Sequence, residues 1–211
     1  RLIVLAPSSV QEMADFVALG FDLAFKYRTP SMIIADGIIG QMMEKVILPP
    51  YRPRRTNDEI RQQCPWATLG KPDNRERNVT TSLALEAEEM ERTNLRLQAK
   101  YKEICENEVR FEAVNCDDAD FVLIAFGSIA RVCMSAMEIG RKEGLKIGVL
   151  RPITLYPFPT LKIQELAKKA KGILTVELSA GQMVEDVRLA VNGSIPVEFY
   201  GRMGGVVPTP E

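Results

Sequence analysis

Residues 119–150 read ADFVLIAFGSIARVCMSAMEIGRKEGLKIGVL, and this stretch decides the fold class. An apolar run over 119–126 leads through Gly127-Ser128 into a segment whose apolar side chains recur at helical spacing up to Lys142. Gly144 ends that helix, and residues 146–150 form a second apolar run typical of a buried strand. The order of strand, helix and strand predicts a βαβ unit with parallel strands.

The same alternation continues to the end of the chain. We expect helices over 160–170 and 182–192, and strands over 172–178 and 196–200. Residues 151–159 contain three prolines and are expected to form an extended connection. Residues 119–211 are therefore predicted to form an α/β domain with a parallel sheet, helices on both faces and right-handed crossovers.

Residues 1–48 predict one further βαβ unit, with strands over 2–5 and 31–35. Ser9 and Glu12 have the spacing of a capping box at the start of the intervening helix. The residues expected to form its buried face are Val10, Met13, Ala14, Val17, Ala18, Phe21 and Phe25. Two strands are too few for an independent sheet, and the chain begins inside an apolar run, so we expect this unit to be part of a larger domain.

Residues 49–118 separate these two blocks and read as a linker arm with a long helix. The arm is rich in proline and charge up to about Thr81, and it contains Trp66, which we expect to dock on a neighbouring surface. From Leu83 to about Phe111 the apolar residues recur at three- and four-residue spacing. We expect this helix to pack on the protein's own core, with a coiled-coil partner as the alternative.

Composition excludes several classes of function. The 211 residues carry 27 basic and 28 acidic side chains, and this balance gives no electrostatic case for binding nucleic acid or an anionic membrane. There is no histidine, so histidine-based triads and histidine metal ligands are excluded. The four cysteines are widely spaced, which predicts ordinary buried or half-buried thiols and a cytoplasmic location, and no apolar run is long enough to span a bilayer.

Four short motifs are candidates for a chemical role. Gly127-Ser128 lacks the rest of a dinucleotide-binding motif and predicts a tight turn. The segment from Glu177 to Gln182 could hold an anion at a helix N-terminus, but an interdomain contact is the favoured interpretation. Adjacent Glu185 and Asp186 point about 100° apart and suit a solvated face. Arg202 lies among glycines at 201–205, which favours a loop that docks on a partner.

Several longer stretches together resemble one family, the α subunits of 2-oxoacid:ferredoxin oxidoreductases, and the branched-chain (2-ketoisovalerate) group in particular. They are 2–13 (LIVLAPSSVQEM), 26–30 (KYRTP), 150–159 (LRPITLYPFP), 181–188 (GQMVEDVR) and 201–210 (GRMGGVVPTP). The resemblance implies a transketolase C-terminal-like domain over 119–211, a linker arm over 49–118, and the C-terminal remnant of a pyrimidine-side thiamine diphosphate domain over 1–48.

The resemblance also implies a reaction and an assembly. Members of the family oxidatively decarboxylate a 2-oxoacid on thiamine diphosphate, pass electrons through iron–sulfur clusters to ferredoxin and release an acyl-coenzyme A. Cofactor and clusters are expected to involve partner β and γ subunits, with a δ subunit and self-association left open. The family's substrate-binding segment and its cofactor-activating glutamate are not found in residues 1–211, so no catalytic, cofactor-binding or metal residue is assigned, and no cofactor is expected to bind to this chain alone.

Two other interpretations remain open at the level of sequence. The β chain of a lipoamide-linked 2-oxoacid dehydrogenase ends in the same kind of domain, but its short interdomain linker leaves the arm with Trp66 unexplained. A non-catalytic module that binds a partner is the alternative from another class of protein.

Overall fold

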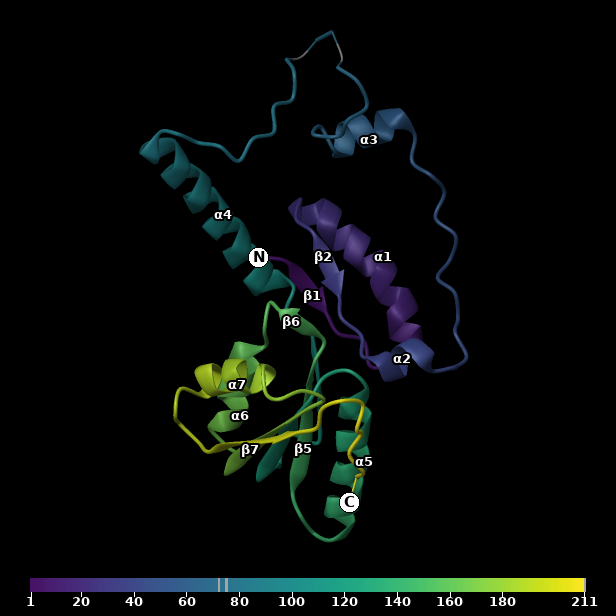
Figure 1. The fold of residues 1–211 in the computed structure, drawn as a ribbon, viewed down its shortest axis with the longest axis vertical. Helices are drawn as coiled ribbons and strands as arrows, with labels where there is room; N and C mark the ends of the chain where they lie inside the picture. The colour runs from purple at the N-terminus through teal and green to yellow at the C-terminus, as the bar shows by residue number, and fades with distance from the viewer. Residues whose placement is uncertain (72, 75, 211) are drawn as a thin grey trace. The chain divides into compact units, whose positions relative to one another are not determined.

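The computed structural model describes residues 1–71, 73–74 and 76–210 of the chain, which divides into two compact units. One unit combines Arg1–Leu48 with the residues from Ile104 onward, and the other is Pro49–Glu103 (Figure 1). Each unit is described by itself below.

The larger sheet of the first unit contains β3 (Phe111–Val114), β4 (Phe121–Ile124), β5 (Ile147–Pro152), β7 (Gly172–Glu177) and β8 (Val197–Gly201). The strand order is β3-β5-β4-β7-β8, and the pairs β5-β4, β4-β7 and β7-β8 are all parallel. The predicted parallel sheet is therefore confirmed. Strand β3 pairs antiparallel with β5 at the edge and was missed, because the helical spacing before it was extended as far as Phe111.

Helices cover both faces of this sheet, as expected (Figure 1). On one face, α5 (Ser128–Lys142) packs Ile129, Cys133 and Met137 against strand residues that include Val149 and Val176. On the other face, α6 (Thr160–Ala167) and α7 (Met183–Val191) pack against the strands. The residues at the centre of that second core are Val122, Ile124, Leu150, Ile163 and Val187, each at most 1% exposed.

A second, smaller sheet has the order β2-β1-β6, formed by β1 (Ile3–Leu5), β2 (Ser31–Ile33) and β6 (Thr154–Tyr156). Strands β1 and β2 are parallel, as predicted, whereas β6 is antiparallel to β1. The segment 151–159 is extended, as expected, but its pairing with β1 as strand β6 was not predicted. Strand β6 thereby joins the first block of sequence to the last.

Helix α1 (Val10–Tyr27) packs on the smaller sheet with a different face from the one predicted. Its buried residues include Phe16, Leu23 and Tyr27. Of the residues predicted to be buried, Phe21 is 64% exposed and Val17 is 48% exposed. The helix is apolar on two sides, so periodicity alone could not decide which side packs on β1 and β2.

The second unit contains α3 (Asn57–Gln63) and most of α4 (Ala87–Asn107). Helix α4 is shorter at both ends than the predicted 83–111. Within α4, all of whose residues are described, Ile104 is the one buried residue, and packing of the rest of the helix on the protein's own core stays a prediction. Trp66 is half-buried, and its docking on a neighbouring surface stays a prediction.

Helix α4 has Glu88 and Glu89 in its first turn. Acidic side chains at this end stabilise a helix, because they interact favourably with its dipole. Charge and helix propensity thus stabilise α4 along with the packing of Ile104.

We predict that Leu150→Ala lowers the free energy of unfolding by about 2–5 kcal/mol, because the substitution leaves a cavity at a fully buried position. Leu189→Ala is the matched control, since Leu189 is 77% exposed and should cost less than about 0.5 kcal/mol. Chemical denaturation followed by circular dichroism measures both. Equal losses for the two variants would contradict the assignment of this core.

Candidate functional site

The carboxyl ends of β4, β7 and β8 lie along one edge of the larger sheet, the edge at which parallel α/β sheets generally bind ligands. Three connections leave the sheet there, at Gly127, Leu178 and Arg202. Leu178 and Arg202, together with α2 (Gly37–Gln41), line a cavity of about 380 Å³ at this edge. This edge, where the two sheets of the first unit meet, is the candidate functional site.

Asp36 joins α2 to the start of α5. Its Oδ1 accepts hydrogen bonds from the backbone N–H groups of Ile38 and Ile39, at 3.1 and 3.0 Å, and so caps α2. Its Oδ2 accepts a hydrogen bond of 2.8 Å from the N–H of Ser128, the first residue of α5. One carboxylate therefore caps two helices that are 92 residues apart in the chain.

Gly127 makes this arrangement sterically feasible. Its φ of +72° is strained for any residue with a side chain, and an added Cβ would lie 2.8 Å from Oδ2 of Asp36. The prediction of a tight turn at Gly127-Ser128 agrees with this geometry. The place that a ligand phosphate would take in a dinucleotide site is occupied by the Asp36 carboxylate.

Glu177 caps the N-terminus of α7 in a similar way. It is buried, and its carboxylate accepts hydrogen bonds from the N–H groups of Gln182, Met183 and Val184, at 3.0, 3.1 and 2.9 Å. The hydroxyl of Ser179 donates a fourth hydrogen bond to it at 2.9 Å. The carboxylate of Glu177 thus bonds within its own domain, and an interdomain contact of the segment Glu177–Gln182 stays a prediction.

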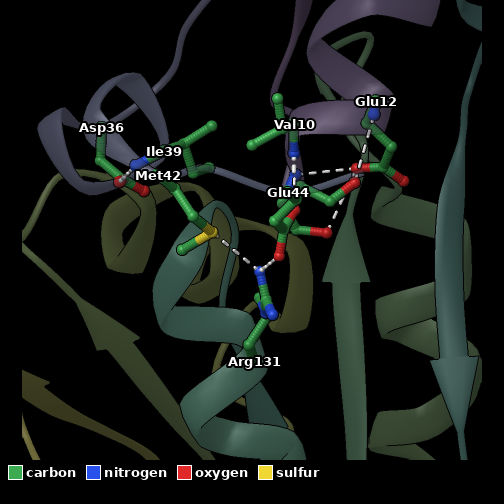
Figure 2. A network of polar contacts seen from close by, with 9 residues as sticks. Val10, Glu12, Asp36, Ile39, Met42, Glu44 and Arg131 are labelled. Carbon is green, nitrogen blue, oxygen red and sulfur yellow. Dashed lines mark hydrogen bonds and ion pairs between the residues drawn. The ribbon is translucent and has the colours of Figure 1, made fainter. Parts of the chain in front are cut away.

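Glu44 provides a third internal carboxylate, at the start of α1 (Figure 2). It accepts a hydrogen bond of 3.0 Å from the N–H of Val10 and forms an ion pair of 2.6 Å with Arg131 of α5. The hydrogen bonds from Val10 and Arg131 lower the pKa of Glu44. Arg131 also donates to the sulfur of Met42, at 3.2 Å, so α5 is held to the segment that follows α2.

Arg151, at the end of β5, is a buried cation between the larger sheet and α1. Its two terminal nitrogens donate to both carboxylate oxygens of Glu12, at 2.9 and 2.8 Å, and its Nε donates to Glu112 at 2.9 Å. Burial raises the pKa of Glu12, but the hydrogen bonds from Arg151 and Ser8 outweigh it, so that pKa lies below its ordinary value. The bidentate pair fixes α1 against the larger sheet.

The predicted capping box at the start of α1 is only half right. Ser9 accepts the hydrogen bond from the N–H of Glu12, as expected. The Glu12 carboxylate, however, accepts from the N–H and the hydroxyl of Ser8, at 2.7 and 3.2 Å, because its other contacts are to Arg151. The tertiary ion pair has displaced the local arrangement.

A second buried carboxylate, Glu108, anchors the chain where α4 ends. It accepts hydrogen bonds of 2.7 Å from both Lys26 and Tyr27 and of 2.9 Å from Arg110. Burial raises the pKa of Glu108, but the hydrogen bonds from Lys26 and Tyr27 lower it further than burial raises it. Glu108 therefore fixes the end of α1 next to the start of β3.

The remaining sequence candidates have no catalytic arrangement. Glu185 and Asp186 are exposed on α7, as predicted, and partial desolvation together with the Glu185 and Glu177 carboxylates raises the pKa of Asp186. Cys64, Cys116 and Cys133 are buried thiols, and burial raises the pKa of Cys133 to about 12. Cys105 is exposed, contrary to the prediction of buried or half-buried thiols.

Two negative findings concern the residues that the structure describes. Among them, no three His, Cys, Asp or Glu side chains are grouped so that they could hold a metal ion. Within the same residues, no helix combines the length and the apolar character that crossing a membrane requires.

Two family models match the chain, and together they cover most of it. Residues 1–110 match the thiamine diphosphate-binding domain of pyruvate flavodoxin/ferredoxin oxidoreductases, and residues 119–211 match core domain II of pyruvate:ferredoxin oxidoreductase. The chain belongs to the 2-oxoacid:ferredoxin oxidoreductase family, as its resemblance implied.

Curated relatives differ in how similar they are to this chain. The chain is 47% identical over 207 residues to ketoisovalerate oxidoreductase subunit VorB of Methanothermobacter thermautotrophicus, a match that covers 97% of this chain and 56% of that protein. It is 31% identical to the 2-oxoglutarate synthase subunit KorA of Methanocaldococcus jannaschii, covering 100% of this chain and 62% of KorA. The chain is thus more similar to the ketoisovalerate protein than to KorA, and it spans about half the length of the curated relatives it matches.

A solved structure agrees on the fold. The 2-oxoglutarate:ferredoxin oxidoreductase from Magnetococcus marinus superposes with a TM-score of 0.78 at 22% identity, covering 99% of this chain and 40% of that one. At this identity the match supports the fold alone, and it confirms the mixed α/β architecture.

The described residues do not fit the diphosphate of the cofactor at this site. A diphosphate needs free N–H groups at a helix N-terminus or a metal ion held by oxygen ligands. The N-termini of α1, α5 and α7 already carry Glu44, Asp36 and Glu177, and the described residues contain no metal-binding group of the kind defined above.

We predict that Arg151→Met lowers the free energy of unfolding by about 3 kcal/mol, because it leaves the partly buried Glu12 carboxylate without its cation. Glu12→Gln in the same background should recover part of this loss, since the unpaired charge is removed. Arg131→Met is the control, and its loss should be smaller, because the side chain of Arg131 is 48% exposed whereas that of Arg151 is 5% exposed. A double-mutant cycle by urea denaturation measures these terms, and additive losses would contradict the coupling of Arg151 and Glu12.

The same carboxylates give the fold a defined dependence on acid. The pKa values of Glu12 and Glu108 are lower in the folded state than the ordinary 4.5, so their stabilisation is present above that value and is lost as the pH falls through the folded pKa. We predict that the free energy of unfolding decreases below pH 4.5 and that Glu12→Gln makes this decrease shallower. Identical pH profiles for the wild type and Glu12→Gln would show that Glu12 does not contribute.

Proposed function

We propose that this chain is part of the α-type subunit of a thiamine diphosphate-dependent 2-oxoacid:ferredoxin oxidoreductase that acts on 2-ketoisovalerate. The observation that carries the proposal is the 47% identity over 97% of the chain to a ketoisovalerate oxidoreductase subunit. The lower identity to 2-oxoglutarate synthase subunits supports a branched aliphatic substrate over a dicarboxylate.

The proposed reaction consumes one 2-oxoacid, one coenzyme A and two oxidised ferredoxins. The bond between the carboxylate carbon and the carbonyl carbon breaks, carbon dioxide leaves, and a thioester forms between the acyl carbon and the coenzyme A sulfur. The two electrons released reduce the two ferredoxins by one electron each, and one proton is released. Thiamine diphosphate, bound elsewhere in the assembly, would supply the electron sink for this decarboxylation.

Within this enzyme the chain has a structural part. Its segments are proposed to be the remnant of the pyrimidine-side domain (1–48), the linker arm (49–118) and the transketolase C-terminal-like domain (119–211). The internal capping of three helix N-termini supports the view that no catalytic, cofactor-binding or metal residue lies on this chain. Arg151, Asp36 and their partners are proposed to hold the domains of the subunit in one orientation.

The cofactor site and the electron carriers are therefore proposed to depend on other subunits of the complex. We propose that thiamine diphosphate binds at an interface with a β subunit, that iron–sulfur clusters lie in partner chains including a γ or δ subunit, and that ferredoxin is the acceptor. The exposed apolar side chains of the arm, such as Leu83 and Leu85, support contacts with other subunits or with a second copy of this chain. Four free cysteines are in keeping with a cytoplasmic enzyme.

The test is an assay of the complex purified through a tag on the full-length subunit. With coenzyme A and thiamine diphosphate present, we expect 2-ketoisovalerate to reduce methyl viologen with a kcat/KM about tenfold or more above those for pyruvate and 2-oxoglutarate. Omitting coenzyme A should abolish formation of the acyl thioester.

Two outcomes would overturn the proposal. Preference for 2-oxoglutarate would reject the substrate assignment while leaving the reaction class intact. No viologen reduction with any 2-oxoacid, together with NAD⁺ reduction in the presence of lipoamide, would favour the lipoamide-linked dehydrogenase instead.

A further inference from the structure

We infer that the cavity between α2 and the loop after β8 is a binding site for a small aliphatic carboxylate, with Arg202 as the residue that binds the carboxylate group. The inference does not depend on the reaction proposed above.

The cavity has the size and lining of a small-molecule site. Its volume of about 380 Å³ lies toward the lower end of the ~300–1,000 Å³ usual for ligand pockets. Apolar side chains form most of its wall, contributed by Ile38, Leu178, Val206 and Val207. Polar groups come from Gln41 and Arg202, and from Asp36 at one end of α2.

Among the described residues of this lining, Arg202 is the one cation. In the part of the chain that the structure describes, its guanidinium has neither a hydrogen bond nor an ion pair, whereas Arg131, Arg141 and Arg151 are all paired. Its backbone N–H donates to the carbonyl of Glu177 at 3.1 Å, which fixes the root of the side chain at the sheet edge. A planar guanidinium held in this way is suited to bind a carboxylate through two parallel hydrogen bonds.

The loop after Arg202 brings the apolar wall to the same place. Gly204 and Gly205 have φ values of +68° and +86°, which residues with a side chain rarely adopt. These conformations turn the chain so that Val206 and Val207 line the cavity. The sequence Gly-Arg-Met-Gly-Gly thus places a cation and two branched apolar side chains around one space.

Asp36 fixes the orientation of the ligand. Its carboxylate already accepts three backbone hydrogen bonds, and its negative charge repels a second anion from its end of the cavity. The carboxylate of the ligand therefore lies at Arg202, and the aliphatic part lies against Ile38 and Leu178. Inorganic phosphate lacks the aliphatic part and leaves this wall exposed to water, so we expect it to bind more weakly.

The probe for the test is 3-methylbutanoate, titrated by calorimetry into the full-length protein together with the chains that copurify with it. We expect binding of 3-methylbutanoate to be about tenfold or more tighter than binding of its neutral analogue 3-methylbutanamide or of inorganic phosphate. Arg202→Met should weaken 3-methylbutanoate binding about tenfold, because the charge-assisted hydrogen bonds are lost while the aliphatic stem remains.

Arg188→Met is the matched control, since Arg188 is an exposed arginine on α7 outside the cavity lining, and it should bind the probe like the wild type. Leu178→Asn should weaken 3-methylbutanoate binding without changing that of phosphate, and circular dichroism verifies that each variant is folded.

The inference is overturned if Arg202→Met binds 3-methylbutanoate like the wild type, if phosphate binds equally well, or if no probe binds. None of these outcomes bears on viologen reduction, so the two proposals fail independently.

Discussion

The buried guanidinium of Arg151 is the interaction on which the first unit depends. It lies at the end of β5 in the larger sheet, yet its strongest contacts are to Glu12 of α1, which packs on the smaller sheet. A buried cation is costly unless its charge and its hydrogen bonds are satisfied, and here Glu12 and Glu112 satisfy them together. The pair therefore specifies how α1 meets the larger sheet, and it does so in addition to the backbone pairing of β1 with β6.

The capped helix ends follow the same principle and limit what the chain can do. A helix N-terminus at the carboxyl edge of a parallel sheet is a ready site for a phosphate. In this chain Asp36 and Glu177 occupy two such ends, and Glu44 occupies the start of α1. These three carboxylates stabilise the first unit from within. Arg202 is the cation that lines the cavity at this edge. This arrangement suits a subunit that supports chemistry carried out elsewhere in an assembly.

Much of the fold could be predicted from the sequence, because local pattern is sufficient for strands and helices that alternate. The parallel strands β4, β5, β7 and β8 and the helices between them were found from apolar runs and helical spacing. Strands β3 and β6 were missed, since each is short and depends on a partner far along the chain. The buried face of α1 was also wrong, because a helix that is apolar on two sides does not reveal which side has a partner.

The polar contacts of Asp36 with Ser128 and of Arg151 with Glu12 were not predicted, for a related reason. Asp36 followed by Gly37 is a recognisable helix cap, but its second hydrogen bond, to Ser128, depends on tertiary structure. Arg151 carried a usable signal, since an arginine directly after the apolar run that ends at Leu150 must have a buried partner or leave the sheet. Nothing in the sequence identified Glu12 as that partner, because the two residues are 139 positions apart.

We propose that this chain holds the domains of the subunit together and that the cofactor diphosphate binds outside it. The most direct test is the structure of the assembled complex with thiamine diphosphate bound. In that structure we expect Arg151 still to pair with Glu12, Asp36 still to cap α5, and the diphosphate to lie on residues outside this chain. A diphosphate oxygen bonded to the N–H of Ser128 or Gln182, with Asp36 or Glu177 displaced, would contradict it.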